Sequence, residues 1–239
     1  MNIYGSRLNP TIINSRWYSL ILLKEQLNIA IKQFLTGEKR AVRLIDFGCG
    51  NKPYEKLFSP YVEEYLGLDI EGNPSADFII DENEQSSIKS NSADVVIPTQ
   101  VLEHVDNPAA YLSESYRMLR KDGLLIISTH GYWIYHPDPT DYWRWTSAGL
   151  KKILTEQGFE IEYFRGIIGR PAAGLHLLQD TLIFKIPKFL TPLISIPFQI
   201  AMYVFDKILT RQTTRDKDAG IFFIVCKAVK NDGERVDGK

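Results

Sequence analysis

Short runs of apolar residues alternate with polar or helical stretches along most of this chain. Each run ends in polar or turn-forming residues, which is typical of buried strands joined by helices. The predicted strands span residues 42–47, 65–69, 77–80, 94–98, 124–129, 159–165 and 221–229. Because strands that alternate with helices pair in parallel, the pattern predicts an α/β fold.

Apolar residues at helical spacing mark the helices between these strands. Residues 14–35 form the first predicted helix, which a Thr-Gly pair ends. Residues 107–123 form another, with asparagine at the cap and proline in the first turn. Residues 146–158 form a third, from a threonine cap to a terminal glycine.

One segment departs from this pattern, because residues 189–205 carry no charge. It lies within a longer apolar stretch whose length suggests a membrane span, but prolines at 187, 192 and 197 interrupt it. One alternative is two kinked helices that pack on the core or on a second copy of the chain, as a homodimer. Another is a peripheral membrane or lipid contact through residues 182–209. Basic side chains that favour this contact flank the segment at Lys185, Lys188, Lys207, Arg211 and Arg215.

The length of 239 residues suits one α/β domain over residues 1–239. Within it we expect an N-terminal helix at 14–35, a ligand-binding core at 42–165, an apolar helical insertion at 171–217 and a last strand at 221–229.

Charge and cysteine content exclude several classes of protein. The 28 basic and 29 acidic residues give a net charge of -1, so we expect no nucleic-acid partner. Cys49 and Cys226 do not form a metal-binding pair, so the sequence predicts no metal site and no disulfide framework. Residues 1–10 lack the features of a secretory signal. We therefore expect a cytoplasmic location, with membrane association through the apolar segment as the alternative.

Two strand ends carry residues that suit a nucleotide pocket. The first strand ends in Asp46, Phe47, Gly48, Cys49 and Gly50, and the next ends in Asp69 and Ile70. Glycine lets backbone approach a ligand closely, and an acid at the second strand end can accept hydrogen bonds from both ribose hydroxyls. Pro53 stands where a dinucleotide-binding fingerprint needs its third glycine, which disfavours a nicotinamide cofactor.

The order of these motifs resembles the class I S-adenosylmethionine-dependent methyltransferases, in particular the small-molecule and ubiquinone-type branch. Residues 99–105, Thr-Gln-Val-Leu-Glu-His-Val, resemble the family's signature after the fourth strand. Residues 119–125 resemble the helix-turn-strand that follows it. The resemblance covers residues 42–162 and implies a Rossmann-like, doubly wound, seven-stranded mixed sheet.

The resemblance also implies S-adenosylmethionine as the cofactor and a set of residues that contact it. Asp69 matches the acid that binds the ribose, and Asp81, or its neighbour Glu82, falls where the family contacts the adenine. Lys52 stands where the family often has glycine. The implied cofactor-binding residues are Asp46, Phe47, Gly48, Cys49, Gly50, Asp69, Ile70, Asp81, Glu82, Thr99 and Gln100.

Candidate bases occur after the fifth strand, where residues 129–145 are rich in aromatic side chains. This loop lies at the carboxyl edge of the predicted sheet, where open α/β folds bind ligands. We select His136 and Asp141 as candidate catalytic residues. Asp141 could instead pair with Arg144 to fix the loop, and His104 is interpreted as a capping or packing residue.

The absence of one motif after the fourth predicted strand narrows the class of methyl acceptor. Residues 97–100, Ile-Pro-Thr-Gln, replace the Asn/Asp-Pro-Pro-Tyr/Phe motif of enzymes in this fold that methylate planar amino groups. This disfavours planar amide and amine acceptors and leaves oxygen, aliphatic nitrogen or carbon nucleophiles. Of these we expect oxygen, on a small molecule or a glycan. The aromatic loop and the apolar segment favour a lipid-linked saccharide. The alternative is a non-catalytic cofactor-binding or scaffold protein with the same fold.

Overall fold

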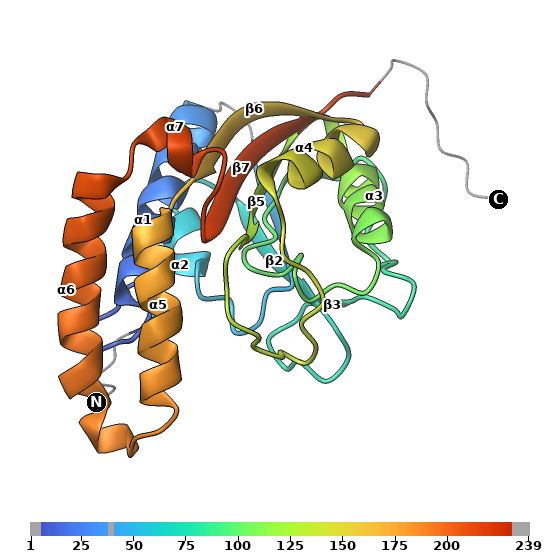
Figure 1. The fold of residues 1–239 in the computed structure, drawn as a ribbon. Coiled ribbons are helices and arrows are strands. Elements are labelled where there is room, and N and C mark those ends of the chain that lie inside the picture. Colours follow the sequence, from blue (N-terminus) through green and yellow to red (C-terminus); the bar gives the residue numbers. More distant parts are fainter. Residues whose placement is uncertain (1–5, 38–40, 231–239) are drawn as a thin grey trace.

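The computed structural model, which describes residues 6–37 and 41–230, contains all seven predicted strands in one sheet (Figure 1). Residues 1–5, 38–40 and 231–239 of the predicted domain lie outside the described residues. The strands are β1 (Arg43–Phe47), β2 (Glu64–Asp69), β3 (Phe78–Ile79), β4 (Ala93–Val96), β5 (Leu119–His130), β6 (Phe159–Gly166) and β7 (Ile221–Ala228). Their order is β3-β2-β1-β4-β5-β7-β6.

The sheet is mixed, as expected. Strands β1 to β5 run parallel to one another, whereas β7 is antiparallel to both β5 and β6. The parallel strands therefore end at one edge, and the residues that follow β1, β2, β4 and β5 meet there. This confirms the Rossmann-like, doubly wound fold.

Helices cover both faces of the sheet. They are α1 (Trp17–Ala30) with a π-helical turn at Ile31–Leu35, α2 (Glu55–Phe58), α3 (Pro108–Met118), α4 (Ser147–Glu156), α5 (Arg170–Ile183), a 3-10 turn at Lys188–Leu190, α6 (Thr191–Leu209) and α7 (Gln212–Arg215). Tyr111 of α3 and Leu150 of α4 belong to the apolar cluster on one face. Leu27 of α1, Ala173 of α5 and Met202 of α6 belong to the cluster on the other.

The predicted helix caps form, but one predicted boundary is wrong. The side chains of Asn107 and Thr146 each accept a backbone hydrogen bond at 3.1 Å, at the starts of α3 and α4. However, α3 ends at Met118 instead of continuing to residue 123. Leu119 has an extended backbone and pairs with Ala93 of β4, so β5 begins five residues before its predicted start. Leu119 fits the apolar stripe of α3 as well as a buried strand, which is why periodicity misplaced it.

The apolar segment forms α6, which packs against α5 in an insertion between β6 and β7. Lys188–Leu209 is long and apolar enough to cross a membrane by length and composition, and 28% of its most apolar window is buried. The polarity of α6 is inverted relative to a surface helix of a globular protein. Its buried positions are Ser195, Gln199, Met202 and Asp206. Its exposed positions include Leu193, Ile200, Tyr203, Val204, Phe205, Ile208 and Leu209.

The buried polar residues of α6 bond to the N-terminal segment. Tyr18 donates from its hydroxyl to Asp206 Oδ2 at 2.8 Å and from its backbone to Gln199 Oε1 at 2.7 Å. Gln199 in turn donates to the carbonyl of Ser15 at 2.8 Å. The Asp206 carboxylate also accepts from Gly169 N at 3.0 Å. These contacts, together with the ion pair between Arg16 and Asp180 at 2.6 Å, are called the polar seam below.

The polar seam explains why α6 turns its apolar side outward. A buried carboxylate or amide without partners costs about 1–3 kcal/mol or more, so these side chains must face the donors and acceptors that satisfy them. Once Gln199 and Asp206 face α1, the apolar residues on the opposite side of α6 face away from the core.

We expect the variant Tyr18→Phe to lower the free energy of unfolding by about 1–3 kcal/mol, because it leaves a buried carboxylate oxygen of Asp206 without its hydroxyl donor. Urea unfolding followed by circular dichroism measures the change. Tyr203→Phe is the matched control. Among the described residues, the Tyr203 hydroxyl has exposed Lys207 as its one hydrogen-bond partner, so its loss should change stability by less than about 0.5 kcal/mol. Equal stability of the two variants would contradict the importance of the polar seam.

Candidate cofactor and acceptor site

A cavity of about 510 Å³ lies at the carboxyl ends of β1, β2 and β4. It is lined by Arg7, Gly48, Gly50, Asp69, Ile70, Glu71, Gly72, Asn73, Thr99, Gln100, Val101, His104, His136, Asp138 and Pro139. Six of these were predicted from the sequence as cofactor-binding residues: Gly48, Gly50, Asp69, Ile70, Thr99 and Gln100. The cavity is called the cofactor cavity below.

The turn after β1 requires glycine. Gly48 has a φ of +78°, and a Cβ atom there would lie 2.6 Å from the side chain of Val101. Gly50 also has a positive φ, of +51°. Gln100, which follows β4, adopts a φ of +59° although it is not glycine. Sparsely populated backbone of this kind is concentrated at functional sites, and here it lies on both sides of the cavity.

Asp69 is the acid at the end of β2. Its Oδ2 accepts hydrogen bonds from Gly50 N at 2.7 Å and Asn73 Nδ2 at 2.6 Å, and its Oδ1 accepts one from Ile70 N at 2.8 Å. A carboxylate has about four lone-pair positions, so Oδ1 retains capacity for a ligand hydroxyl. These bonds also fix the carboxylate against the glycine turn.

Asp46, Phe47 and Cys49 are buried and do not line the cofactor cavity. Asp46 accepts a hydrogen bond from the Tyr65 hydroxyl at 2.5 Å, and burial raises the pKa of this carboxyl to about 7 despite that bond. The Phe47 ring stacks on Tyr111 with 3.8 Å between ring centroids. These residues shape the turn from behind.

Asp81 and Glu82 are exposed and lie outside the cavity lining. Asp81 Oδ1 instead accepts backbone hydrogen bonds from Asn83 at 2.8 Å and Gln85 at 2.9 Å, which shape its own turn. Sequence reasoning did not identify the lining residues 71–73, although they directly follow the end of β2. Their place after a strand end at the carboxyl edge could have identified residues 71–73 from the sequence.

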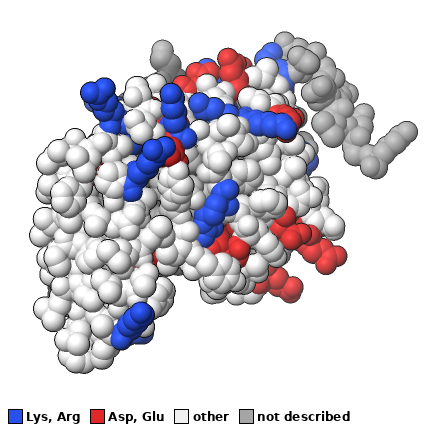
Figure 2. Space-filling model, in the orientation of Figure 1, with Lys and Arg blue, Asp and Glu red and all other residues white. Residues whose placement is uncertain are grey.

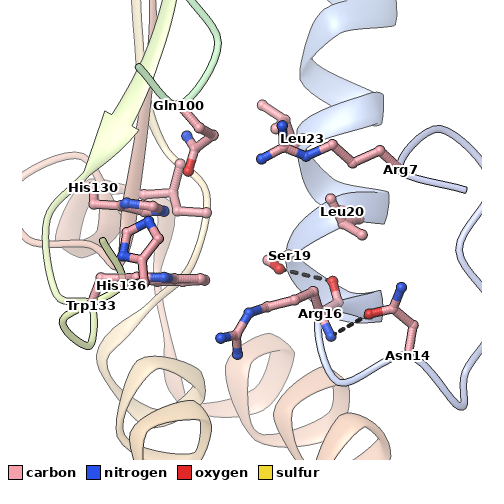
Figure 3. A pocket seen from close by; sticks show the side chains of 11 residues that line it. Arg7, Asn14, Arg16, Ser19, Leu20, Leu23, Gln100, His130, Trp133 and His136 are labelled. Carbon is pink, nitrogen blue, oxygen red and sulfur yellow. Dashed lines mark hydrogen bonds between the residues drawn. The ribbon is translucent and has the colours of Figure 1, made fainter. Parts of the chain in front are cut away.

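A second cavity of about 280 Å³ adjoins the N-terminal segment (Figure 3). It is lined by Arg7, Asn14, Arg16, Ser19, Leu20, Leu23, Gln100, His130, Trp133, His136 and Ile221. Figure 3 shows His130, His136 and Trp133 on one wall, with Arg7 and Arg16 extending from the opposite side. Three residues, Arg7, Gln100 and His136, line both cavities. The second is called the acceptor cavity below.

Of the two candidate bases, Asp141 is fully engaged. Its two carboxylate oxygens each contact a terminal nitrogen of Arg144 at 2.6 Å, and Oδ2 also accepts from His136 N at 2.9 Å. Burial acts to raise the pKa of Asp141, but the Arg144 hydrogen bonds outweigh it and lower that pKa to about 2. Asp141 therefore remains an ionised carboxylate that fixes the loop, in line with the alternative interpretation of this pair.

His136 occupies the boundary between the two cavities. Its Nδ1 lies 3.1 Å from the carbonyl of Ile134 and 3.3 Å from Asp141 Oδ2. These two acceptors favour a proton on Nδ1, which leaves Nε2 as the nitrogen with a free lone pair. Burial lowers the pKa of His136, which favours the neutral ring.

The aromatic side chains of this loop are not all open to a ligand. His130 stacks on the Trp133 ring with 4.4 Å between centroids, and the His176 ring contacts the same indole at 4.2 Å. Trp133 is therefore half-buried between these two imidazole rings, although it also lines the acceptor cavity. Tyr135 and Tyr142 are the most exposed aromatic residues of this loop, at 70% and 50%.

Comparison with known proteins was made for the sequence and for the fold. The family model for the methyltransferase domain matches residues 22–163. A curated Mycolicibacterium smegmatis protein, described as a probable S-adenosylmethionine-dependent methyltransferase, is 26% identical over 139 residues. That match covers 52% of this chain and 54% of the relative, so the chain matches about half the length of that protein.

Solved structures share the fold at low sequence identity. Phosphoethanolamine N-methyltransferase 2 of Haemonchus contortus, bound to S-adenosylhomocysteine and phosphomonomethylethanolamine, is 15% identical with a TM-score of 0.55. The match covers 92% of this chain and 58% of that one. The cyclase SpnF is 17% identical with a TM-score of 0.55, over 87% of this chain and 81% of that one. These likenesses show the fold alone.

We expect Asp69→Ala to weaken S-adenosylhomocysteine binding roughly 10- to 100-fold, because the variant lacks the carboxylate that would accept the ribose hydrogen bonds. Isothermal titration calorimetry measures the affinity. Asp81→Ala is the matched control, an acid outside the cavity that should bind as the unaltered protein does. Weaker binding by Asp81→Ala than by Asp69→Ala would contradict the assignment of the cofactor cavity. It would support instead the prediction from sequence that Asp81 contacts the adenine.

Proposed function

Because this chain belongs to the class I S-adenosylmethionine-dependent methyltransferases, we propose that it transfers a methyl group to an oxygen of a small molecule or glycan. One observation carries the proposal: the cofactor cavity and the acceptor cavity meet at Gln100 and His136. Methyl transfer needs the nucleophile in line with the sulfonium group, and two adjoining cavities support that arrangement.

The choice of oxygen rests on proton chemistry. A hydroxyl acceptor must lose its proton during or after the transfer, so a group able to act on that proton must lie at the junction. Of the three residues that line both cavities, Arg7, Gln100 and His136, only His136 presents a nitrogen lone pair that can accept a proton. Asp141 acts as a positioning residue, because it orients the loop and the His136 ring.

The wall of the acceptor cavity favours a polar, negatively charged acceptor. Arg7 and Arg16 both line the cavity, and Arg16 is fixed in place by its ion pair with Asp180 at 2.6 Å. Guanidinium groups bind phosphate and carboxylate in a forked geometry. A sugar phosphate or a uronic acid would match these two side chains.

We further propose that the acceptor is lipid-linked and that the enzyme meets it at an anionic membrane surface. The exposed apolar residues of the insertion include Phe184, Phe189 and Leu193, which are 79%, 78% and 72% exposed. In Figure 2 the lobe formed by α5 and α6 is largely white, whereas basic and acidic side chains interleave elsewhere on that face. So large an exposed apolar surface marks a contact with a membrane or a protein.

The charges around this face support a membrane contact over contact with a second copy of the chain. Residues 181–205 contain two charged side chains, Lys185 and Lys188, and both are exposed lysines. A symmetric pair of chains would bring these lysines together, whereas anionic lipid headgroups would neutralise them. The polar seam on the opposite side of α6 keeps the helix against the domain, which favours a surface contact over a span.

We expect His136→Ala to lower the rate of methyl transfer by roughly 100-fold or more while S-adenosylhomocysteine affinity stays unchanged within about threefold. The assay is transfer of a labelled methyl group from S-adenosylmethionine to a panel of hydroxylated, carboxylated and phosphorylated saccharides. Tyr135→Phe, on an exposed ring of the same loop, is the control. Tight cofactor binding without transfer to any acceptor would favour the non-catalytic scaffold over the enzyme.

We expect the unaltered protein to float with phosphatidylglycerol vesicles at low salt. The triple variant Phe184→Ser, Phe189→Ser, Leu193→Ser should bind these vesicles at least about tenfold more weakly, because each change removes exposed apolar area. The control is Tyr61→Ser with Ile79→Ser, two exposed apolar residues outside the insertion. Binding equal to the control would contradict the proposal. A dimer that dissociates in the triple variant, without vesicle binding, would assign the face to a second copy.

A further inference from the structure

All four histidines of the chain lie near the loop after β5, and three of them surround one buried carboxylate. The Glu103 side chain is fully buried, and its Oε1 lies 2.8 Å from His130 Nδ1 and 4.0 Å from His104 Nε2. His136 completes the group, because one ligand atom each from Glu103, His130 and His136 lie within 4.8 Å of one another. The sequence analysis did not predict this cluster, because its members come from separate loops and strand ends.

The closest pair in this cluster is not a conventional hydrogen bond. Glu103 Oε1 and His130 Nδ1 approach to 2.8 Å, yet the ring is not aligned to donate, and neither atom has another hydrogen-bond partner among the described residues. Buried polar atoms without partners are costly and call for an explanation. These two atoms are therefore candidate ligands for a shared cation, which would satisfy both of them once they move slightly apart from 2.8 Å.

The other atoms of these side chains are fixed by neighbours. Thr129 donates to Glu103 Oε2 at 2.8 Å, the carbonyl of Ile134 lies 3.1 Å from His136 Nδ1, and the carbonyl of Thr140 lies 2.6 Å from His104 Nδ1. In the rings of His104 and His136, Nε2 is therefore the nitrogen that remains available to bind a cation. Metal-binding histidines and carboxylates are oriented in this way by a second layer of hydrogen bonds.

We propose that Glu103, His130 and His136 bind a divalent transition-metal cation, with His104 near enough to serve as a fourth ligand. Imidazole nitrogens with one carboxylate suit Zn²⁺ and its neighbours in the first transition row, whereas Mg²⁺ prefers oxygen ligands. Ligand atoms around a tetrahedral cation lie roughly 3.4 Å apart, because each metal bond is about 2.0–2.1 Å. Side-chain movements of about 1 Å would complete the site.

The place of this cation site gives it a role, which rests on the proposed function. His130 and His136 line the acceptor cavity, and His136 also lines the cofactor cavity. A cation bound there would lie beside the position of the acceptor oxygen. It could bind that hydroxyl as an additional ligand and make it more acidic. His136 would then act as a ligand of the cation, and the proton of the acceptor hydroxyl would pass to solvent water as the bond from the methyl carbon to oxygen forms and its bond to sulfur breaks.

The test is cation binding by the full chain, purified without a histidine tag and freed of metal. Zn²⁺ titration by calorimetry and Co²⁺ titration by visible absorption should each show one site per chain, with the absorption bands of a site containing nitrogen ligands. We expect His130→Asn and Glu103→Gln each to weaken Zn²⁺ binding by about 100-fold or more. His176→Asn is the matched control, because His176 contacts the same indole but turns toward Arg16.

Folding of each variant is checked by its S-adenosylhomocysteine affinity, which the cation site should not change by more than about threefold. No binding of Zn²⁺ or Co²⁺ by the unaltered protein would overturn the proposal, as would variants that bind like His176→Asn. Methyl transfer by metal-free protein without loss of rate would reject the catalytic role of the cation and leave the proposed function intact. Cation binding without methyl transfer to any acceptor would support the cation site and reject the proposed function.

Discussion

The polar seam between the N-terminal segment and the insertion determines where both the acceptor cavity and the apolar face lie. Asp206 joins three parts of the chain through Tyr18, Gly169 and its own helix α6. Because the N-terminal segment supplies one wall of the acceptor cavity, the same contacts that satisfy buried polar atoms also position Arg16 opposite His130. They turn the apolar side of α6 outward at the same time. The wall of the acceptor cavity and the exposed apolar face of α6 therefore depend on one set of hydrogen bonds.

The carboxyl edge of the sheet supplies the other half of the site. Parallel pairing of β2, β1, β4 and β5 brings four strand ends together at this edge, and each strand end contributes residues to the site. Gly48 leaves space for the backbone to close on Val101, and Asp69 supports that turn through Gly50. Further along the edge, β5 ends in His130, next to the buried Glu103. The cofactor cavity and the acceptor cavity adjoin because these strand ends are neighbours.

Local patterns predicted the parts of the fold that local forces determine. Strand positions, the caps at Asn107 and Thr146, and the glycine turn followed from periodicity and from residues with special backbone preferences. Features that depend on distant partners could not be predicted. The inverted polarity of α6 depends on Tyr18, which is 188 positions from Asp206 in sequence. The uncharged run showed only that the segment was apolar.

The same limit applies to the site. The glycines, Asp69 and the pair of Asp141 with Arg144 lie in short local motifs, and the sequence alone suggested each of them. The histidine cluster around Glu103 arises from segments that meet only after folding. The most direct test of the account is a crystal structure of the protein with S-adenosylhomocysteine. We predict the ribose against Asp69 and the sulfur atom facing Gln100 and His136, open to the acceptor cavity. A ligand bound outside the cofactor cavity, or a sulfur atom turned away from His136, would contradict it.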